Sequence, residues 1–319
     1  MPDHLITIFG GTGFIGRHLV GRLAAKGYQI RLAARDPESA TALMTQGNVG
    51  QIVGMKTNVR NQASVERAIA GAHIVINLVG VLFERGAQNF GQLHVDAAER
   101  IARAAKAAGA AQLIHMSALG ASREHAAGYA RSKAVGEELA RAEFPGATVL
   151  RPSVVFGNDD EFFNRFARIL SIAPAFPIVD GGKNKMQPVW VEDLANAIVR
   201  IIENADYQGK TYEFAGPDVL SFREIIEKVL AFTGRKCLLL PAPSGAMSIA
   251  AAFMSLAPGR PLLTPDQIKL LKTDNVATGS EPGLTDLGIA PSRIDAIVPQ
   301  YLRRYKRGGD LFTDPALSD

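Results

Sequence analysis

The hydrophobic positions in the first half of the chain form short apolar runs separated by longer helical stretches. The runs have the length and composition of buried strands, and their alternation with helices predicts a parallel sheet covered on both faces. We therefore expect an α/β fold, with a Rossmann-type doubly wound parallel sheet. The predicted strands are 5–9, 29–33, 51–55, 74–78, 112–116 and 148–150. The predicted helices are 14–26, 63–70, 92–108 and 128–143.

The pattern changes after Arg151, where prolines become frequent and the loops lengthen. A helix is predicted at 191–204, and strands near 176–180 and 211–215 are expected to return to the main sheet. From 221 onwards the chain is expected to form a smaller, mostly helical lobe. The expected domains are a dinucleotide-binding domain at 1–156 and an interleaved C-terminal lobe at 157–319, with a loose tail at 308–319.

Composition and charge narrow the classes of function. Of the 319 residues 47% are hydrophobic, which is ordinary for a globular protein. The net charge of +4 is small, and without a basic tract with interleaved aromatic residues it argues against nucleic acid binding. The single cysteine, Cys237, indicates a reducing compartment. Because the first predicted strand begins near Leu5, we expect no targeting segment and a location in a bacterial cytoplasm.

A glycine-rich loop follows the first predicted strand, in the segment LITIFGGTGFIG at 5–16. Glycines spaced three apart suit a tight turn that lets the backbone approach a pyrophosphate, and the helix that follows directs its N–H groups at the phosphates. The strand before and the helix after make dinucleotide binding a better interpretation than an ordinary turn. The loop residues expected to bind the cofactor are Gly10, Thr12, Gly13, Phe14, Ile15 and Gly16.

The end of the second predicted strand indicates which dinucleotide binds. An acidic residue there would bind the ribose hydroxyls of NAD, whereas an arginine suits the 2′-phosphate of NADP. Both occur, as Arg35 and Asp36. Since Asp36 precedes Pro37, a turn or cap explains it, while the Arg35 guanidinium can pair with a phosphate. The sequence therefore favours NADPH, with NADP+ or NAD as alternatives.

Three further polar residues suggest a nicotinamide site. Ser117 follows the fifth predicted strand, and Tyr129 and Lys133 follow in YARSK at 129–133, one helical turn apart. Beside a nicotinamide, the ammonium would lower the tyrosine pKa, and the phenol could then exchange a proton with a carbonyl or alcohol oxygen. Ser117, Tyr129 and Lys133 are thus the candidate catalytic residues. Six histidines show no metal-ligand spacing, so no metal site is expected. They are His4, His18, His73, His94, His115 and His125.

With these motifs the sequence resembles the extended or atypical short-chain dehydrogenases/reductases. VINLVG at 75–80, HMSALG at 115–120 and RPSVVFG at 151–157 are also similar. The resemblance implies further cofactor contacts along the strand ends. They are Asn58 and Val59 at the adenine, Leu78, Val79 and Gly80 along the cofactor, Met116, Ser117, Tyr129 and Lys133 after the fifth strand, and Pro152, Val154 and Val155 near the nicotinamide.

Four segments resemble a narrower group, the NADPH-binding, dehydrogenase-like accessory subunits of respiratory complex I and their bacterial relatives. These segments are 129–138, 151–169, 187–198 and 212–222. The resemblance implies a structural NADPH, complex I subunits as partners at the junction of the peripheral and membrane arms, and a peripheral location on the inner face of the bacterial inner membrane. The apolar segment 244–259 and the basic segment 301–309 could rest on a membrane surface, or form a core helix and a solvated tail.

Two other functions remain open. One is a free-standing NAD(P)H-dependent oxidoreductase or epimerase/dehydratase that uses Ser117, Tyr129 and Lys133. The other is a regulator that senses NADPH. Tyr129 and Lys133 serve cofactor binding in all three cases, so they do not discriminate. The second half of the chain has no cluster of charged residues suited to a nucleotide diphosphate, which favours the accessory subunit.

Overall fold

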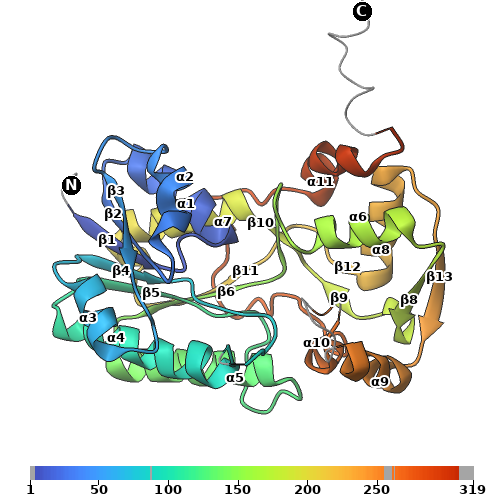
Figure 1. Cartoon of the computed structure of the whole chain (residues 1–319), viewed down its shortest axis with the longest axis horizontal. Helices are drawn as coiled ribbons and strands as arrows, with labels where there is room; N and C mark the ends of the chain where they lie inside the picture. The colour runs from blue at the N-terminus through green and yellow to red at the C-terminus, as the bar shows by residue number, and fades with distance from the viewer. Residues whose placement is uncertain (1–3, 87, 255–260, 262, 309–319) are drawn as a thin grey trace, which may run out of the picture. The chain divides into compact units, whose positions relative to one another are not determined.

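The computed structural model describes residues 4–86, 88–254, 261 and 263–308, and the chain divides into two compact units (Figure 1). The first unit contains the chain up to Pro152, together with Val191–Phe214 and Thr278–Ala290. The second contains Ser153–Trp190, Ala215–Ala277 and the chain from Pro291 onwards. The chain thus passes between the units several times, and its first crossing follows Pro152, close to the boundary at residue 156 given above.

The first unit contains one parallel sheet, which among the described residues has seven strands in the order β11-β6-β5-β4-β1-β2-β3. The first six strands in sequence follow the Rossmann order, because the chain returns to the middle of the sheet after β3 and then builds outwards from β4. The doubly wound parallel sheet expected from the sequence is therefore confirmed. Its strands are β1 (Leu5–Phe9), β2 (Gln29–Ala34), β3 (Ile52–Lys56), β4 (Ile74–Asn77), β5 (Gln112–Met116), β6 (Thr148–Pro152) and β11 (Thr211–Phe214).

Helices cover both faces of this sheet (Figure 1). Phe9 on β1 and Leu113 on β5 point to one face, where they pack with Val65 and Ile101 in a buried cluster. Thr7, on the same face as Phe9, donates a hydrogen bond to the Ala68 carbonyl oxygen at 2.9 Å. The helices on this face are α3 (Gln62–Ile69), α4 (Ala97–Ala107) and α5 (Gly128–Glu143). Those on the other face are α1 (Phe14–Ala25), α2 (Thr41–Met44) and α7 (Val191–Glu203).

One strand expected in the main sheet lies elsewhere. The segment predicted near 176–180 forms β8 (Ala175–Val179), which pairs in parallel with β13 (Leu238–Ala242) in the second unit, so this prediction is wrong. The edge position beside β6 is occupied by β11. Pro177 also has no N–H to donate, which a strand tolerates when it pairs on one side only.

The second unit consists mainly of helices around an apolar cluster that includes Phe163, Ile225 and Val298. Within the described part of this unit there are three short strand pairs, β7 with β10, β9 with β12, and β8 with β13. The helices are α6 (Phe163–Ile172), α8 (Phe222–Thr233), α9 (Ser244–Met254), α10 (Pro265–Leu270) and α11 (Ile294–Leu302). The remaining strands are β7 (Val155–Phe156), β9 (Lys185–Met186), β10 (Val189–Trp190) and β12 (Leu220–Ser221).

The segments proposed for a membrane surface are only partly described. α9 covers 244–254 of the apolar segment, and 255–259 lie outside the described residues. Residues 309–319, which include the last residue of the basic segment and nearly all of the tail, also lie outside them. Over the part of the chain that the structure describes, no helix has both the length and the apolar character needed to span a bilayer.

Candidate functional site

The glycine-rich loop connects β1 to α1 through a tight turn. Gly10 has φ +75°, a conformation that side chains rarely adopt, and a Cβ placed there would lie 3.0 Å from the Leu78 carbonyl carbon. The Gly13 N–H donates to the Gly10 carbonyl oxygen at 3.0 Å and closes the turn. Gly16 has no space for a Cβ because the Gly11 carbonyl lies against it. Gly10 and Gly16 thus leave no room for a side chain, because neighbouring backbone fills the space.

The N-terminus of α1 offers N–H groups to an anion. Gly13 is its N-cap residue, no described side chain caps the first turn, and no acidic residue lies in that turn. The helix dipole and the uncapped N–H groups favour a phosphate at this place. Arg17, in the following turn, donates to the Thr12 carbonyl oxygen at 3.3 Å and supports the loop. The residues present thus fit a dinucleotide pyrophosphate.

At the carboxyl end of β2, Arg35 and Asp36 differ in their surroundings. The Asp36 carboxylate accepts a hydrogen bond from the Glu38 N–H at 3.0 Å, so it caps the short helix 37–40. Arg35 is exposed. Beyond the neighbouring β3, Asn58 lies at the same edge of the sheet, because the Thr57 N–H bonds to the Ala34 carbonyl oxygen at 2.7 Å. Arg35 and Asn58 therefore lie at neighbouring strand ends, and of these two side chains Arg35 carries the charge.

The segment after β4 runs close to the glycine-rich loop. The Leu78 N–H bonds to the Phe9 carbonyl oxygen at 2.9 Å, and the Val79 N–H to the Asn77 side chain at 3.1 Å. Gly80 lies close to the Lys133 ammonium group, because a Cβ on Gly80 would lie 3.2 Å from Lys133 Nζ. The structure thus brings together the residues 10–16, 78–80 and Lys133, which are far apart in the sequence.

Ser117 and Lys133 are both buried beyond the end of β5. Lys133 Nζ donates a hydrogen bond to the Met116 carbonyl oxygen at 3.1 Å. The Ser117 hydroxyl has no hydrogen-bond partner among the described residues, and the residue is 3% exposed. A buried hydroxyl without a partner costs stability, and a water or a ligand oxygen at this position would satisfy it.

The candidate acid–base residue Tyr129 is partly exposed at the start of α5. Its ring meets the His94 ring edge-on, with the centroids 5.5 Å apart. Burial raises the pKa of Tyr129 to about 12. Burial also lowers the pKa of Lys133 to about 8, against the opposing influence of the Glu137 carboxylate. The phenol of the ligand-free protein therefore keeps its proton at neutral pH, as a tyrosine with the ordinary pKa also would.

The two remaining groups of candidate residues divide between the units. Pro152 ends β6 in the first unit, where its carbonyl oxygen accepts from the Leu119 N–H at 3.0 Å. Val154 and Val155 belong to the second unit, where Val155 begins β7. The carbonyl oxygen of Val59, in the first unit, accepts a hydrogen bond from the Arg100 side chain at 2.8 Å.

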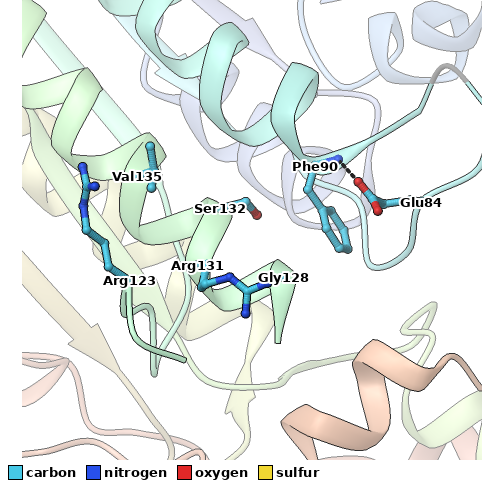
Figure 2. A pocket seen from close by; sticks show the side chains of 7 residues that line it. All are labelled: Glu84, Phe90, Arg123, Gly128, Arg131, Ser132 and Val135. Atoms are coloured by element: carbon cyan, nitrogen blue, oxygen red, sulfur yellow. Dashed lines mark hydrogen bonds between the residues drawn. The ribbon is translucent and has the colours of Figure 1, made fainter. Parts of the chain in front are cut away.

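A surface hollow of about 470 Å³ lies where α5 begins (Figure 2). Its charged side chains have partners, because Arg123 pairs with Glu138, and Glu84 accepts from the Phe90 N–H at 2.7 Å. Arg131 donates to the carbonyl oxygens of His125 and Ala126 at 2.7 and 2.8 Å, so all three charged side chains that line the hollow make contacts within the protein. The residues that line it are Glu84, Phe90, Arg123, Gly128, Arg131, Ser132 and Val135.

Two buried residues near Lys133 were not among those expected from the sequence. His94 is 2% exposed and lies in a π-helical turn (Gly91–Asp96) before α4. Glu137, 5% exposed, lies one turn after Lys133 on α5. His94 was considered only for metal spacing, and the described part of the chain has no cluster of three potential metal ligands. No local signal marks either residue, because their partners are distant in the sequence.

Comparison with known proteins places this arrangement in a family. Residues 6–215 match the model of the NAD dependent epimerase/dehydratase family, and the chain belongs to that family. Over nearly its whole length it is similar to mitochondrial proteins named NADH dehydrogenase (ubiquinone) 1 alpha subcomplex subunit 9. The rat protein is 34% identical over 94% of this chain and 80% of its own length. The Arabidopsis thaliana protein is 34% identical over 96% of this chain and 79% of its own length.

Solved structures show the same fold. An NADPH-dependent quinone oxidoreductase of Escherichia coli, complexed with NADPH, superposes with a TM-score of 0.74 over 93% of this chain and 99% of its own. Its sequence identity is 21%, so this similarity concerns the fold alone. Fold and family together make the first unit an NAD(P)-binding domain.

Proposed function

We propose that this chain is an NADPH-binding accessory subunit of respiratory complex I, in which the cofactor mainly stabilises the fold. The observation that carries this proposal is the 34% identity, over 94% of the chain, to the subunit 9 proteins. The family match ends at residue 215, whereas this similarity continues through most of the second unit. A shared cofactor alone would not require similarity there.

The geometry around Lys133 supports a binding role. Bound NADPH would supply a hydride donor at its nicotinamide ring. Lys133 would hold the nicotinamide ribose, since its Nζ lies beside Gly80. Tyr129, with a pKa raised by burial to about 12, keeps its proton at neutral pH. Both residues can thus serve cofactor binding without any exchange of a proton.

We propose NADPH rather than NADH because of the two residues after β2. The Asp36 carboxylate caps a helix turn and is not directed to a ribose by that contact. Arg35 is exposed at the strand end, where a guanidinium can bind a 2′-phosphate through two hydrogen bonds.

For partners we propose complex I subunits at the junction of the peripheral and membrane arms, on the inner face of a bacterial inner membrane. The second unit offers a surface for such contacts. Leu238 and Leu240 on β13 are 63% and 46% exposed, and exposed Lys236 precedes them. On α9, Ile249 is 63% exposed. Exposed apolar side chains flanked by positive charge suit protein partners near an anionic membrane surface.

A free-standing oxidoreductase is the second candidate, because the Ser117 hydroxyl is buried without a described partner, next to the Met116 carbonyl that Lys133 contacts. In that case, Ser117 would bind a substrate oxygen. Tyr129→Phe separates the two functions, since it removes the phenol proton and leaves the ring. An enzyme would lose most of its turnover, whereas an accessory subunit would keep its cofactor and its partners.

The experiment follows an epitope-tagged chain through native electrophoresis of solubilised membranes from its source organism. We expect it to co-migrate with NADH dehydrogenase activity and to carry NADPH. Tyr129→Phe should behave like the wild type, and Gly13→Ala should lose the cofactor. A chain that is found only free and empty, and that reduces carbonyl compounds at about 1 per second or faster, would overturn the proposal in favour of an enzyme.

A further inference from the structure

His94 lies between two segments that the NADPH site needs. Its carbonyl oxygen lies directly against Gly136 on α5, where a Cβ would overlap it. Its ring stacks on Phe90, with the centroids 5.2 Å apart, and meets Tyr129 edge-on. A Cβ on Gly80 would lie 3.8 Å from His94 Nε2. The imidazole thus contacts both the segment after β4 and the start of α5.

The hydrogen bonds of the ring determine its tautomer. The Val81 N–H lies 3.0 Å from Nε2, and a backbone N–H can only donate, so Nε2 accepts. The proton of the neutral ring is then on Nδ1, which lies 2.8 Å from Ser132 Oγ. Ser132 in turn donates to the Tyr129 carbonyl oxygen at 2.7 Å. Val81, His94, Ser132 and Tyr129 form one continuous chain of hydrogen bonds.

The charge state agrees with this assignment. A second proton, on Nε2 of His94, would point at the Val81 N–H and break this chain of hydrogen bonds. Burial, with Lys133 and His115 nearby, lowers the pKa of His94 to about 2, so the ring stays neutral at physiological pH. π-helical turns frequently occur at functional sites, and His94 lies in one.

We propose that His94 is a positioning residue of the NADPH site: its neutral ring, protonated on Nδ1, ties Val81 to Ser132 and so holds Gly80 and Lys133 in the geometry that the nicotinamide ribose requires. This rests on the proposed NADPH binding and goes beyond it, because it assigns a role to a residue outside the set proposed to contact the cofactor. The ring preorganises the site, so the cofactor does not have to order it on binding.

Two substitutions separate the hydrogen bonds from the packing. His94→Phe keeps a ring of similar size and removes both nitrogens, which leaves the Val81 N–H without its partner. His94→Gln keeps one acceptor and one donor and removes the ring. We expect His94→Phe to raise the Kd for NADPH about tenfold or more, and His94→Gln to raise it less than His94→Phe. Equal or better binding by His94→Phe would overturn the proposal, because packing alone would then suffice.

A matched control and an independent measurement complete the test. His73→Phe, on a partly exposed residue just before β4, should leave the Kd unchanged. Nitrogen-15 spectra of the histidine rings in the ligand-free protein should show His94 protonated on Nδ1 alone, and protonation on Nε2 would overturn the proposal. Should His94→Phe not fold, Ser132→Ala breaks the same chain at its next link and should raise the Kd several-fold.

The proposed function and this inference can fail separately. A wild-type protein with no affinity for NADPH contradicts the proposed function. A wild-type protein that binds NADPH, with His94→Phe binding it equally well, contradicts only the role of His94.

Discussion

Glu137 on α5 accepts hydrogen bonds from Arg151 on β6 at both carboxylate oxygens, with donor–acceptor distances of 2.9 and 2.6 Å. Glu137 is almost fully buried and lies one helical turn after Lys133. Its negative charge opposes the lowering of the Lys133 pKa that burial causes. The ion pair therefore connects helix α5 to the sheet and also helps keep the Lys133 ammonium charged.

Glu137→Gln should lower the free energy of unfolding by about 2 kcal/mol, because it removes the carboxylate charge from the hydrogen bonds of Arg151, whose side chain is 26% exposed. Urea unfolding measures the change. The adjacent Glu138→Gln is the control, since Glu138 pairs with Arg123 at an exposed position and should cost less than about 1 kcal/mol. Similar losses for both variants would contradict the structural role of the Glu137–Arg151 pair.

Lys133 should make the stability of the ligand-free protein depend on alkaline pH. Its pKa is about 8 in the folded protein, against 10.5 for the ordinary side chain. Below pH 8 both states are protonated, and the folded protein bears the full cost of the buried ammonium. Between pH 8 and pH 10.5 the Lys133 amine is deprotonated in the folded protein and protonated in the unfolded chain. The free energy of unfolding should therefore rise with pH, by at most about 1.4 kcal/mol per pH unit.

Comparison with Lys133→Met isolates this contribution from other titrating groups. The difference in free energy of unfolding between the wild type and the variant should change in favour of the wild type from about pH 8 upwards. A difference that stays constant over this range would show that the folded-state pKa is not lowered.

Gly13→Ala should abolish NADPH retention at little cost in stability. The new methyl group would lie 3.1 Å from the Gly10 carbonyl oxygen, a contact that small shifts relieve, and would obstruct the approach of the pyrophosphate. Gel filtration with absorbance of the bound nucleotide measures retention, and we expect a loss of affinity of at least about tenfold. Gly21→Ala, two turns further along α1, is the control and should bind normally. Retention of NADPH by Gly13→Ala would contradict the proposal that the loop 10–16 binds the pyrophosphate.

Arg35→Ala should weaken NADPH binding about tenfold and NADH binding less than about twofold, because only NADPH carries the 2′-phosphate. Titration calorimetry with both nucleotides measures this selectivity. Arg67→Ala, which removes an exposed arginine from α3, should change neither affinity. Equal losses for NADPH and NADH would place Arg35 away from the 2′-phosphate.

Most of the first unit could be predicted from the sequence. The ends of strands β1 to β6 and of helices α1 and α5 agree within about two residues, because buried parallel strands and their crossover helices differ clearly in apolar spacing. The glycine spacing indicated the phosphate loop, and the order of Ser117, Tyr129 and Lys133 along the chain indicated a nicotinamide site. Each of these signals lies within a short stretch of chain.

The tertiary structure alone decided the rest. It paired β8 with β13 instead of the main sheet, brought Glu137 to Arg151, and placed His94 between Val81 and Ser132. The glycine-rich loop was predictable because its turn, its strand and its helix are neighbours in sequence. The partners of His94 and Glu137 are separated from them by between 13 and 38 positions. Such contacts depend on which helices pack against which strands, and the local spacing of residues carries no record of that packing.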